Sequence, residues 1–479
     1  MLQTLKNAWR TKDIRSKLLF TLLILLLYRV GTVIPVPFVD AHGYSAQFSG
    51  TILQYLDLLS GGSLAQATLF ALGVSPYINA SIIIQLLAVV FPKLGEISKN
   101  DKKKMGFITR ITTVVLAVVT ALGYYFLIAQ GSIGLSLVPQ AAKLPWFYAI
   151  VIVTCFVAGA SLVMWLADRI NEHGIGNGVS MILFANIVTS LPRQCIQMYN
   201  LIKATFAYTD KKVFFIILSI LFALFVAAII IGMTVFVIFI TGSERRIPVQ
   251  YAKRVVGRKM YGGQSSNLPI KLNMTGVMPV IFASSIVSLV PTILTFCSVD
   301  PESDTFWGKF ARFTGSEGFV YPIVFFVLII AFAYFYTTIT FDPVDVANNL
   351  KKQGGAIPGI RQGRPTSDYI KKILNKITLA GALFLSVVAV LPIVAGPHVI
   401  QHIIEWILSG NPNYVKELAA ATTPAAIETV KHELADAAST YSSIFTFGGT
   451  SLIIVVGVAL ETFRELEAQL TMRNYKGFL

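Results

Sequence analysis

The sequence predicts an all-α, polytopic membrane protein with ten membrane-spanning helices. Of its 479 residues, 55% are apolar and only 13% are charged, whereas soluble domains carry roughly 25% charged residues. Apolar stretches of about 18 residues or more recur along the whole chain, and each can cross a hydrocarbon core of roughly 30 Å as a helix. Lysine and arginine gather in alternate loops between these stretches.

Backbone polar groups in lipid must bond within their own segment, so the apolar stretches are predicted to be helices. The predicted spans lie near residues 18–34, 74–92, 111–129, 147–167, 179–192, 213–241, 276–297, 322–341, 377–397 and 445–460. The fifth and the tenth are short for a membrane crossing.

The basic residues predict the orientation of the chain. The N-terminus, the even-numbered loops and the C-terminus hold 29 Lys and Arg residues, and the other loops hold 9. Basic loops stay in the cytoplasm, so both termini are predicted to be cytoplasmic. Ten spans divide into two units of five, residues 1–210 and 211–479, which would be inverted if they are repeats. Inverted repeats place a transport pathway at their interface.

One feature of the first external loop and one feature of the second span can each be interpreted in more than one way. The loop 35–73 carries no Lys or Arg and contains a mildly apolar stretch, 52–66, that is too short to span. This stretch fits a re-entrant element, an interfacial helix or a packed loop. In the second span, Asn79 and Gln85 are polar but neutral, which fits either interhelical hydrogen bonds or a seam that opens to water.

Two cytoplasmic loops, 243–273 and 342–376, hold seven basic residues each. Orientation alone requires basic residues there. Long loops without obvious structure also tend to be functional, so the length of these two indicates a further role.

The sequence lacks the motifs of common catalytic sites, so the chain is predicted not to be an enzyme. It has no phosphate-binding loop and no His-Glu-x-x-His metal motif, and no Gly-x-Ser-x-Gly element. Its three cysteines, Cys155, Cys195 and Cys297, have neither metal nor redox spacing; no cofactor or metal is predicted. The span cores contain no Asp, Glu or Lys, which opposes the main alternative, an inverted-repeat solute transporter.

Several strings, in order along nearly the whole chain, resemble the SecY/Sec61-alpha family of protein-conducting channels. They are Ser60-Gly61-Gly62, FALGVSPYINASIIIQLL at 70–87, GIGNG at 174–178, YAKR at 251–254, NNLKK at 348–352, IPGIR at 357–361 and FGGTSL at 447–452. The resemblance implies a bacterial translocase channel that passes unfolded preproteins across the membrane and releases transmembrane segments sideways into lipid.

The resemblance also implies two inverted five-helix halves around a central hourglass pore with a lateral gate. The pore ring it implies is Val74, Ile78, Val179, Leu183, Ile281 and Ile454. An apolar constriction of this kind excludes water and ions. The plug segment it implies is 52–66, with Ile52, Leu56, Leu59, Gly61, Gly62 and Leu64. The lateral gate residues it implies are Asn79, Gln85, Ser284 and Ser285.

The partners that the resemblance implies are the SecE and SecG subunits, the SecA ATPase, the ribosome with its RNA, and SecDF and YidC. Preprotein signal sequences and membrane lipid are its implied ligands, and the bacterial cytoplasmic membrane its location. The docking residues for SecA or the ribosome would be Lys253, Arg254, Arg258, Lys259 and Arg361. Two departures stand out: Gln362 replaces a common proline, which predicts a less stiff loop tip, and the external loop 398–444 is unusually long and has no assigned role.

Overall fold

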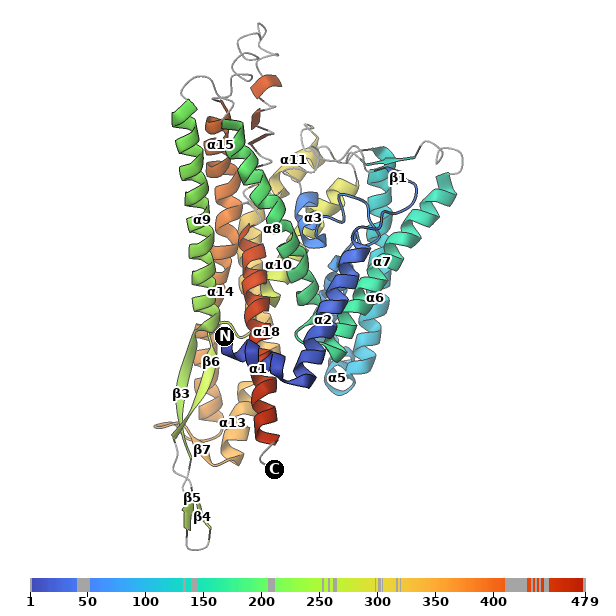
Figure 1. Ribbon diagram of the computed structural model, residues 1–479. Coiled ribbons are helices and arrows are strands. Elements are labelled where there is room, and N and C mark those ends of the chain that lie inside the picture. Colours follow the sequence, from blue (N-terminus) through green and yellow to red (C-terminus); the bar gives the residue numbers. More distant parts are fainter. Residues whose placement is uncertain are drawn as a thin grey trace.

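A computed structural model describes most of the chain. The described residues are 2–40, 52–131, 135–138, 145–205, 212–251, 254–256, 259–261, 265–297, 299, 303, 305–315, 318, 320–409, 429–431, 434–435, 437–438, 441–442 and 448–476. Within them, long helices run side by side, and three small sheets lie outside the helical body (Figure 1).

The first part of the chain is helical apart from two short strands that pair with each other. Its elements are α1 (Leu2–Arg10), α2 (Lys12–Gly31), β1 (Val39–Asp40), α3 (Ile52–Ser60), α4 (Ser75–Val90), α5 (Pro92–Asn100), α6 (Lys102–Gln130), β2 (Ser136–Leu137), α7 (Pro145–His173) and α8 (Gly178–Thr205).

The second part adds strands to the helices. Its elements are α9 (Lys212–Gly242), β3 (Glu244–Tyr251), β4 (Arg254–Val256), β5 (Lys259–Tyr261), β6 (Ser265–Lys271), α10 (Met278–Phe296), α11 (Phe306–Thr314), α12 (Val320–Thr340), α13 (Pro343–Lys352), β7 (Gly355–Ala356), α14 (Arg364–Ala395), a π-helical turn (Gly396–Ile400), α15 (Gln401–Ser409) and α18 (Gly448–Lys476).

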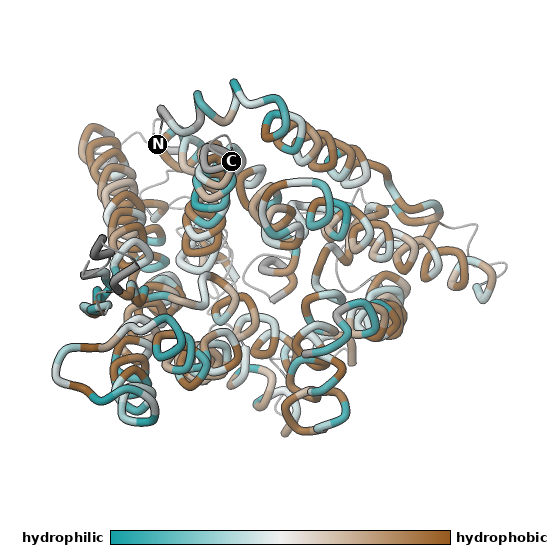
Figure 2. The backbone as a smooth tube through the Cα atoms, turned by 90° about the horizontal axis from the view of Figure 1, so that it is seen from below, coloured by the Kyte–Doolittle hydropathy of each residue, from teal (hydrophilic) through white to brown (hydrophobic). Residues whose placement is uncertain are grey.

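Each of the ten predicted spans coincides with a helix, namely α2, α4, α6, α7, α8, α9, α10, α12, α14 and α18. Seven described helices are long and apolar enough to cross a membrane, or eight if α4 and α5, bent by 117°, form one span. Apolar residues cover the outer surfaces of the helices as well as the spaces between them (Figure 2). This two-sided apolarity is expected where lipid replaces water around a protein.

The two spans that the sequence predicts as short are long helices. Helix α8 has 28 residues and continues through Pro192, and α18 has 29 residues and continues well beyond position 460. A proline removes one backbone donor but does not have to end a long helix when tertiary contacts hold it. Both helices therefore extend past the apolar part from which the spans were predicted.

The basic loop 243–273 folds into strands rather than remaining irregular. Strand β3 pairs antiparallel with β6 along seven residues and with β7 at its end. Ile247 and Val249 are buried on one face of β3 and alternate with exposed neighbours. This period of two is the signature of a strand with one covered face, so the sequence carried a signal for this sheet. The sheet, α13 and the C-terminus lie toward one end of the molecule, and α3, α11 and α15 toward the other (Figure 1).

Candidate functional site

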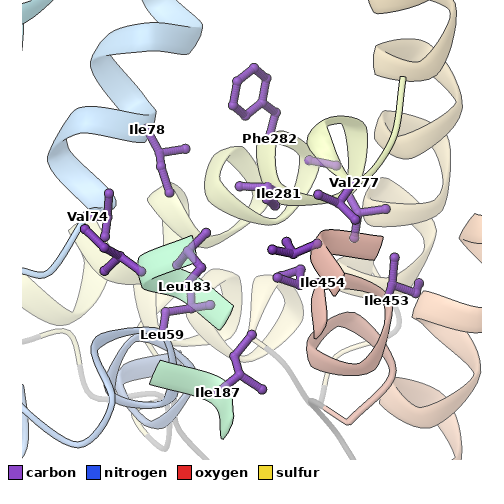
Figure 3. Close-up of a cluster of buried hydrophobic side chains, with 14 of the residues drawn as sticks. Leu59, Val74, Ile78, Leu183, Ile187, Val277, Ile281, Phe282, Ile453 and Ile454 are labelled. Carbon is purple, nitrogen blue, oxygen red and sulfur yellow. The ribbon is translucent and has the colours of Figure 1, made fainter. Parts of the chain in front are cut away.

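The predicted ring positions come together at the centre of the helical body. Val74, Ile78, Leu183, Ile281 and Ile454 belong to one cluster of buried apolar residues, and each is at most 4% exposed. Val179 is partly buried and packs against the same cluster. These residues lie on or beside α4 and α8 of the first predicted half and on α10 and α18 of the second. Figure 3 shows Ile78, Leu183, Ile281 and Ile454 converging from four helices.

The cluster extends further than the predicted ring. Ile187 lies one turn beyond Leu183 on α8 and is 2% exposed. Leu59, at the end of α3, belongs to the same cluster and lies beside Leu183 in Figure 3. The spacing of Val179, Leu183 and Ile187 at i, i+4 and i+8 is a helical stripe, so this pattern could have predicted Ile187. No local signal predicts that Leu59 reaches the cluster.

The predicted plug segment is a short helix followed by a tight, hydrogen-bonded turn. Leu59 packs into the central cluster, whereas Leu64 is buried in a second cluster and Leu56 packs against that one. Asp57 Oδ1 accepts a hydrogen bond of 2.8 Å from the Ala65 N–H, and Tyr124 donates its hydroxyl to the Leu64 carbonyl. The segment is therefore packed between two apolar clusters.

A further plug position, Ile52, opens α3, and its side chain lies outside the description. Gly61 and Gly62 follow the helix with positive φ values of 72° and 88°. At Gly61 a Cβ atom would also come within 2.7 Å of Asn186 Oδ1. Glycine suits this left-handed conformation. At Gly61 the absence of a side chain also allows Asn186 of α8 to approach closely.

Two side chains that the sequence did not single out as functional bind the end of α3. Asn186 of α8 is buried, and its Nδ2 donates to the Leu59 carbonyl at 2.7 Å and to the Tyr28 hydroxyl at 2.9 Å. Arg29 Nη1 donates to the Gly61 carbonyl at 3.3 Å. The last carbonyls of a helix lack partners in their own helix and carry partial negative charge, so an amide donor and a cation both stabilise them.

A buried asparagine in an apolar span was the one sequence signal for this contact, because such a group requires partners. We call Arg29 and Asn186, with the two carbonyls they bind, the plug latch.

The predicted gate lies where α4 and α6 pack against α10, and α10 against α12. Gln85 Oε1 accepts a hydrogen bond of 2.5 Å from the Tyr336 hydroxyl of α12, and its Nε2 donates to Ser81 at 2.9 Å. Gln85 therefore joins α4 to α12, helices of different predicted halves. Tyr336 was not predicted, because an aromatic residue near a helix end has many ordinary roles.

Among the described residues, the other three gate candidates make no hydrogen bond across the seam. Ser284 and Ser285 both donate to the Ile281 carbonyl of their own helix, at 2.8 and 2.9 Å. The Asn79 Oδ1 atom is buried and has no hydrogen-bond partner among the described residues. An unsatisfied buried carbonyl oxygen is costly, so Asn79 is a site where a change of packing or the entry of water would be favourable.

The described docking residues, Arg254, Lys259 and Arg361, lie at the end of the molecule that holds the β3–β6 sheet. Arg254 and Lys259 belong to the paired strands β4 and β5, while Lys253 and Arg258 lie outside the described residues. Arg361 is exposed on the turn after β7. Burial, and to a smaller extent the positive charge of the neighbouring Arg464, lowers the pKa of Lys271 at the base of the sheet.

The Arg361 turn is held by side-chain hydrogen bonds. Gln362 Nε2 donates to the Gly355 carbonyl at 3.1 Å, and Thr366 Oγ1 donates to the Arg361 carbonyl at 2.8 Å. The amide of Gln362 thus restrains the turn with a bond that a proline could not make.

The long external loop begins as helix. The π-helical turn continues α14 into α15, whose Ile404 and Ile407 are buried against Leu201 of α8 and Phe222 of α9. Residues 410–428 lie outside the description. Within the described part of the chain, no three His, Cys, Asp or Glu side chains are grouped so that they could hold a metal ion.

Comparison with known proteins identifies the family. The SecY family model matches residues 68–410. Proteins named protein translocase subunit SecY from Streptomyces galbus and Mycobacterium tuberculosis are 37% and 38% identical to this chain, and each comparison covers 100% of both chains.

Solved structures share the fold at low sequence identity. A protein-conducting channel superposes with a TM-score of 0.58 at 16% identity and covers 95% of this chain and 92% of its own. Sec61 in the canine ribosome–channel complex gives a TM-score of 0.55 at 15% identity, with the same coverage. The predicted membrane fold is thus confirmed, and full-length identity above a third to translocase subunits shows that this chain belongs to the SecY family.

Proposed function

We propose that this chain is the protein-conducting channel of a bacterial Sec translocase. The observation that carries the proposal is the meeting of aliphatic side chains from α4, α8, α10 and α18 with the end of α3. A narrow aliphatic neck offers water no hydrogen bonds and therefore resists ions, yet its side chains can move aside for a polypeptide. In this proposal the central cluster is the ring, and α3 with the turn after it is the plug.

The proposed lateral gate is the seam that Gln85 and Tyr336 bridge. A signal sequence would leave through this seam because its apolar run prefers lipid to water. The two proposed halves, 1–210 and 211–479, would separate here while α8 and α9 remain in contact.

The solute-transporter alternative is less well supported. Coupled transporters use ionisable residues inside the membrane as relays or ion sites. Here Asp168, near the end of α7, forms an ion pair of 2.7 Å with Arg110 of α6. Such a pair at a helix end is already accounted for by its partner.

The proposed orientation places both termini, the β3–β6 sheet and the Arg361 turn in the cytoplasm, where a motor or a ribosome would dock. Exposed arginines suit this role because a planar guanidinium binds carboxylate, phosphate or backbone acceptors with two donors at once. SecA, the ribosome, SecE, SecG, SecDF and YidC are the partners proposed for this chain.

Reconstitution tests the function. Vesicles containing this chain with its SecE-type partner, supplied with SecA, ATP and an unfolded preprotein, should protect the preprotein from added protease. Vesicles in which a reducible bifunctional crosslinker joins α4 to α12, between cysteines placed at Gln85 and Tyr336 in a chain without its native cysteines, should lose this protection and regain it after reduction. Protection that is independent of the chain, or unaffected by the crosslink, would contradict the proposal.

A further inference from the structure

The short helix α11 (Phe306–Thr314) lies between the two proposed gate helices. It connects α10 to α12 in sequence and packs against both of them. It sits at the end of the molecule away from the β3–β6 sheet, at about the level of α3 (Figure 1). Neither the ring, the plug nor the docking surface uses it.

The side chains of α11 divide into an inward and an outward face. Gly308 is buried and Ala311 is half-buried, so the small residues face the protein. Phe306, Trp307 and Phe313 are 73%, 55% and 59% exposed. At 100° per residue Phe306 and Phe313 fall opposite Gly308 and Trp307 lies about 100° from it, so the outward face is apolar.

The aromatic rings form a continuous platform. The ring centroids of Phe306 and Trp307 lie 5.6 Å apart, and those of Trp307 and Phe310 lie 6.2 Å apart. Rings at these distances attract one another and hold a common surface. Four large rings grouped on an outward face are more than the scattered apolar residues that a water-exposed surface normally carries.

Basic residues flank this platform on one side. Lys309 and Arg312 are both exposed, and they are one turn apart on the helix, between the aromatic face and the buried face. A helix with an aromatic face, a basic flank and modest length is typical of segments that lie in the membrane interface. Trp and Phe rings bury there, while Lys and Arg reach the headgroups.

The neighbouring spans indicate what covers the aromatic face. Ile293 near the end of α10 and Ile323 and Val327 near the start of α12 are each more than half exposed. In a membrane-spanning protein such side chains face lipid. The aromatic face of α11 therefore continues a lipid-facing surface at the level where these two spans leave the hydrocarbon core.

We propose that α11 is an interfacial anchor: its aromatic face inserts between lipids of the leaflet on the plug side. The assignment to the outer leaflet rests on the proposed orientation of the channel; the lipid contact itself does not. Because α11 joins α10 to α12, the lipid that holds it also restrains the gate helices.

Fluorescence of Trp307 in the full-length protein tests the lipid contact. The emission lost in Trp307→Phe, relative to the parent protein in the same vesicles, isolates this one tryptophan from the other four. Phosphatidylcholine brominated near the headgroup end of its acyl chains should quench this component, and aqueous iodide should not. Quenching by iodide, or by neither agent, would overturn the proposal, because the face would then be covered by water or by protein.

Discussion

Replacing Asn186 with alanine should weaken the hold on the proposed plug. The Asn186 side chain makes two hydrogen bonds, to the Leu59 carbonyl and to the Tyr28 hydroxyl. These two bonds act differently. Tyr28 and Asn186 both lie on spans, so their bond can persist when α3 moves away. The bond to Leu59 exists only while α3 is seated, so it alone favours the closed state over the open one.

The size of the effect follows from that single bond. A hydrogen bond contributes about 1 kcal/mol net, and leaving a buried acceptor without its donor costs about 1–3 kcal/mol. Water that enters the space left by the side chain would satisfy part of the Leu59 carbonyl. We therefore expect Asn186→Ala to shift the closed-to-open equilibrium by about 1–2 kcal/mol, roughly five- to thirty-fold.

Single-channel recordings in planar bilayers, without substrate, measure this shift as an increase in open probability. Ser190→Ala is the matched control, because Ser190 lies one turn away on α8 and donates only to the Ile187 carbonyl of its own helix. If the Asn186→Ala channel opens no more often than the Ser190→Ala channel, the plug latch does not hold the plug closed.

Three further predictions concern the seal, the docking turn and the topology. Changing Ile78 and Ile281 together to asparagine supplies hydrogen-bonding groups at the neck, so the resting channel should leak ions in bilayer recordings. Arg361→Glu should abolish SecA-driven import into vesicles, because its new charge repels the partner's acceptors, while thermal unfolding changes within about 0.5 kcal/mol for this exposed position. A cysteine at Gln353, which is exposed beside the β7 turn, should react with an impermeant thiol reagent only after cells are opened.

Each of these has an outcome that contradicts it. A control pair, Ile404→Asn with Ile407→Asn, introduces the same polar groups into a separate buried cluster that contains no ring, plug or latch residue. Equal leakage from this pair would point to general loosening rather than a ring. Normal import by Arg361→Glu would remove that residue from the docking surface, and labelling of the Gln353 cysteine in intact cells would invert the topology.

The fold could be predicted because lipid leaves few choices for the backbone. An apolar stretch of sufficient length must form a helix whatever its neighbours do, so the ten predicted spans coincide with helices. The ends were less predictable: α8 runs through Pro192. The sheet in the first basic loop was not predicted: Ile247 and Val249 alternate with exposed residues, but this pattern is short and stands among charged residues and turn formers.

The site was predictable in its apolar part and not in its polar part. Aliphatic residues on a helical stripe, such as Leu183, must face something apolar, and here they meet one another. Hydrogen bonds between distant segments follow no sequence period. Asn186 and Leu59 are separated by 127 positions, and Tyr336 and Gln85 by 251. Only the packing of the helices brings these donors to their acceptors.

The kinds of contact between the proposed halves indicate where the channel can open. On the α4–α12 side the Tyr336 hydroxyl donates to the Gln85 amide, which is a bond between neutral groups, and such a bond contributes about 1 kcal/mol. On the α8–α18 side the carboxylate of Glu465 accepts from the Gly176 N–H at 2.8 Å, and a bond to an ionised group is roughly twice as strong. A polypeptide that offers its own backbone or side-chain partners can replace the neutral bond at little cost, whereas the charged one is harder to replace. We therefore expect the weaker seam to open first, while the α8–α18 contact still holds the two proposed halves together.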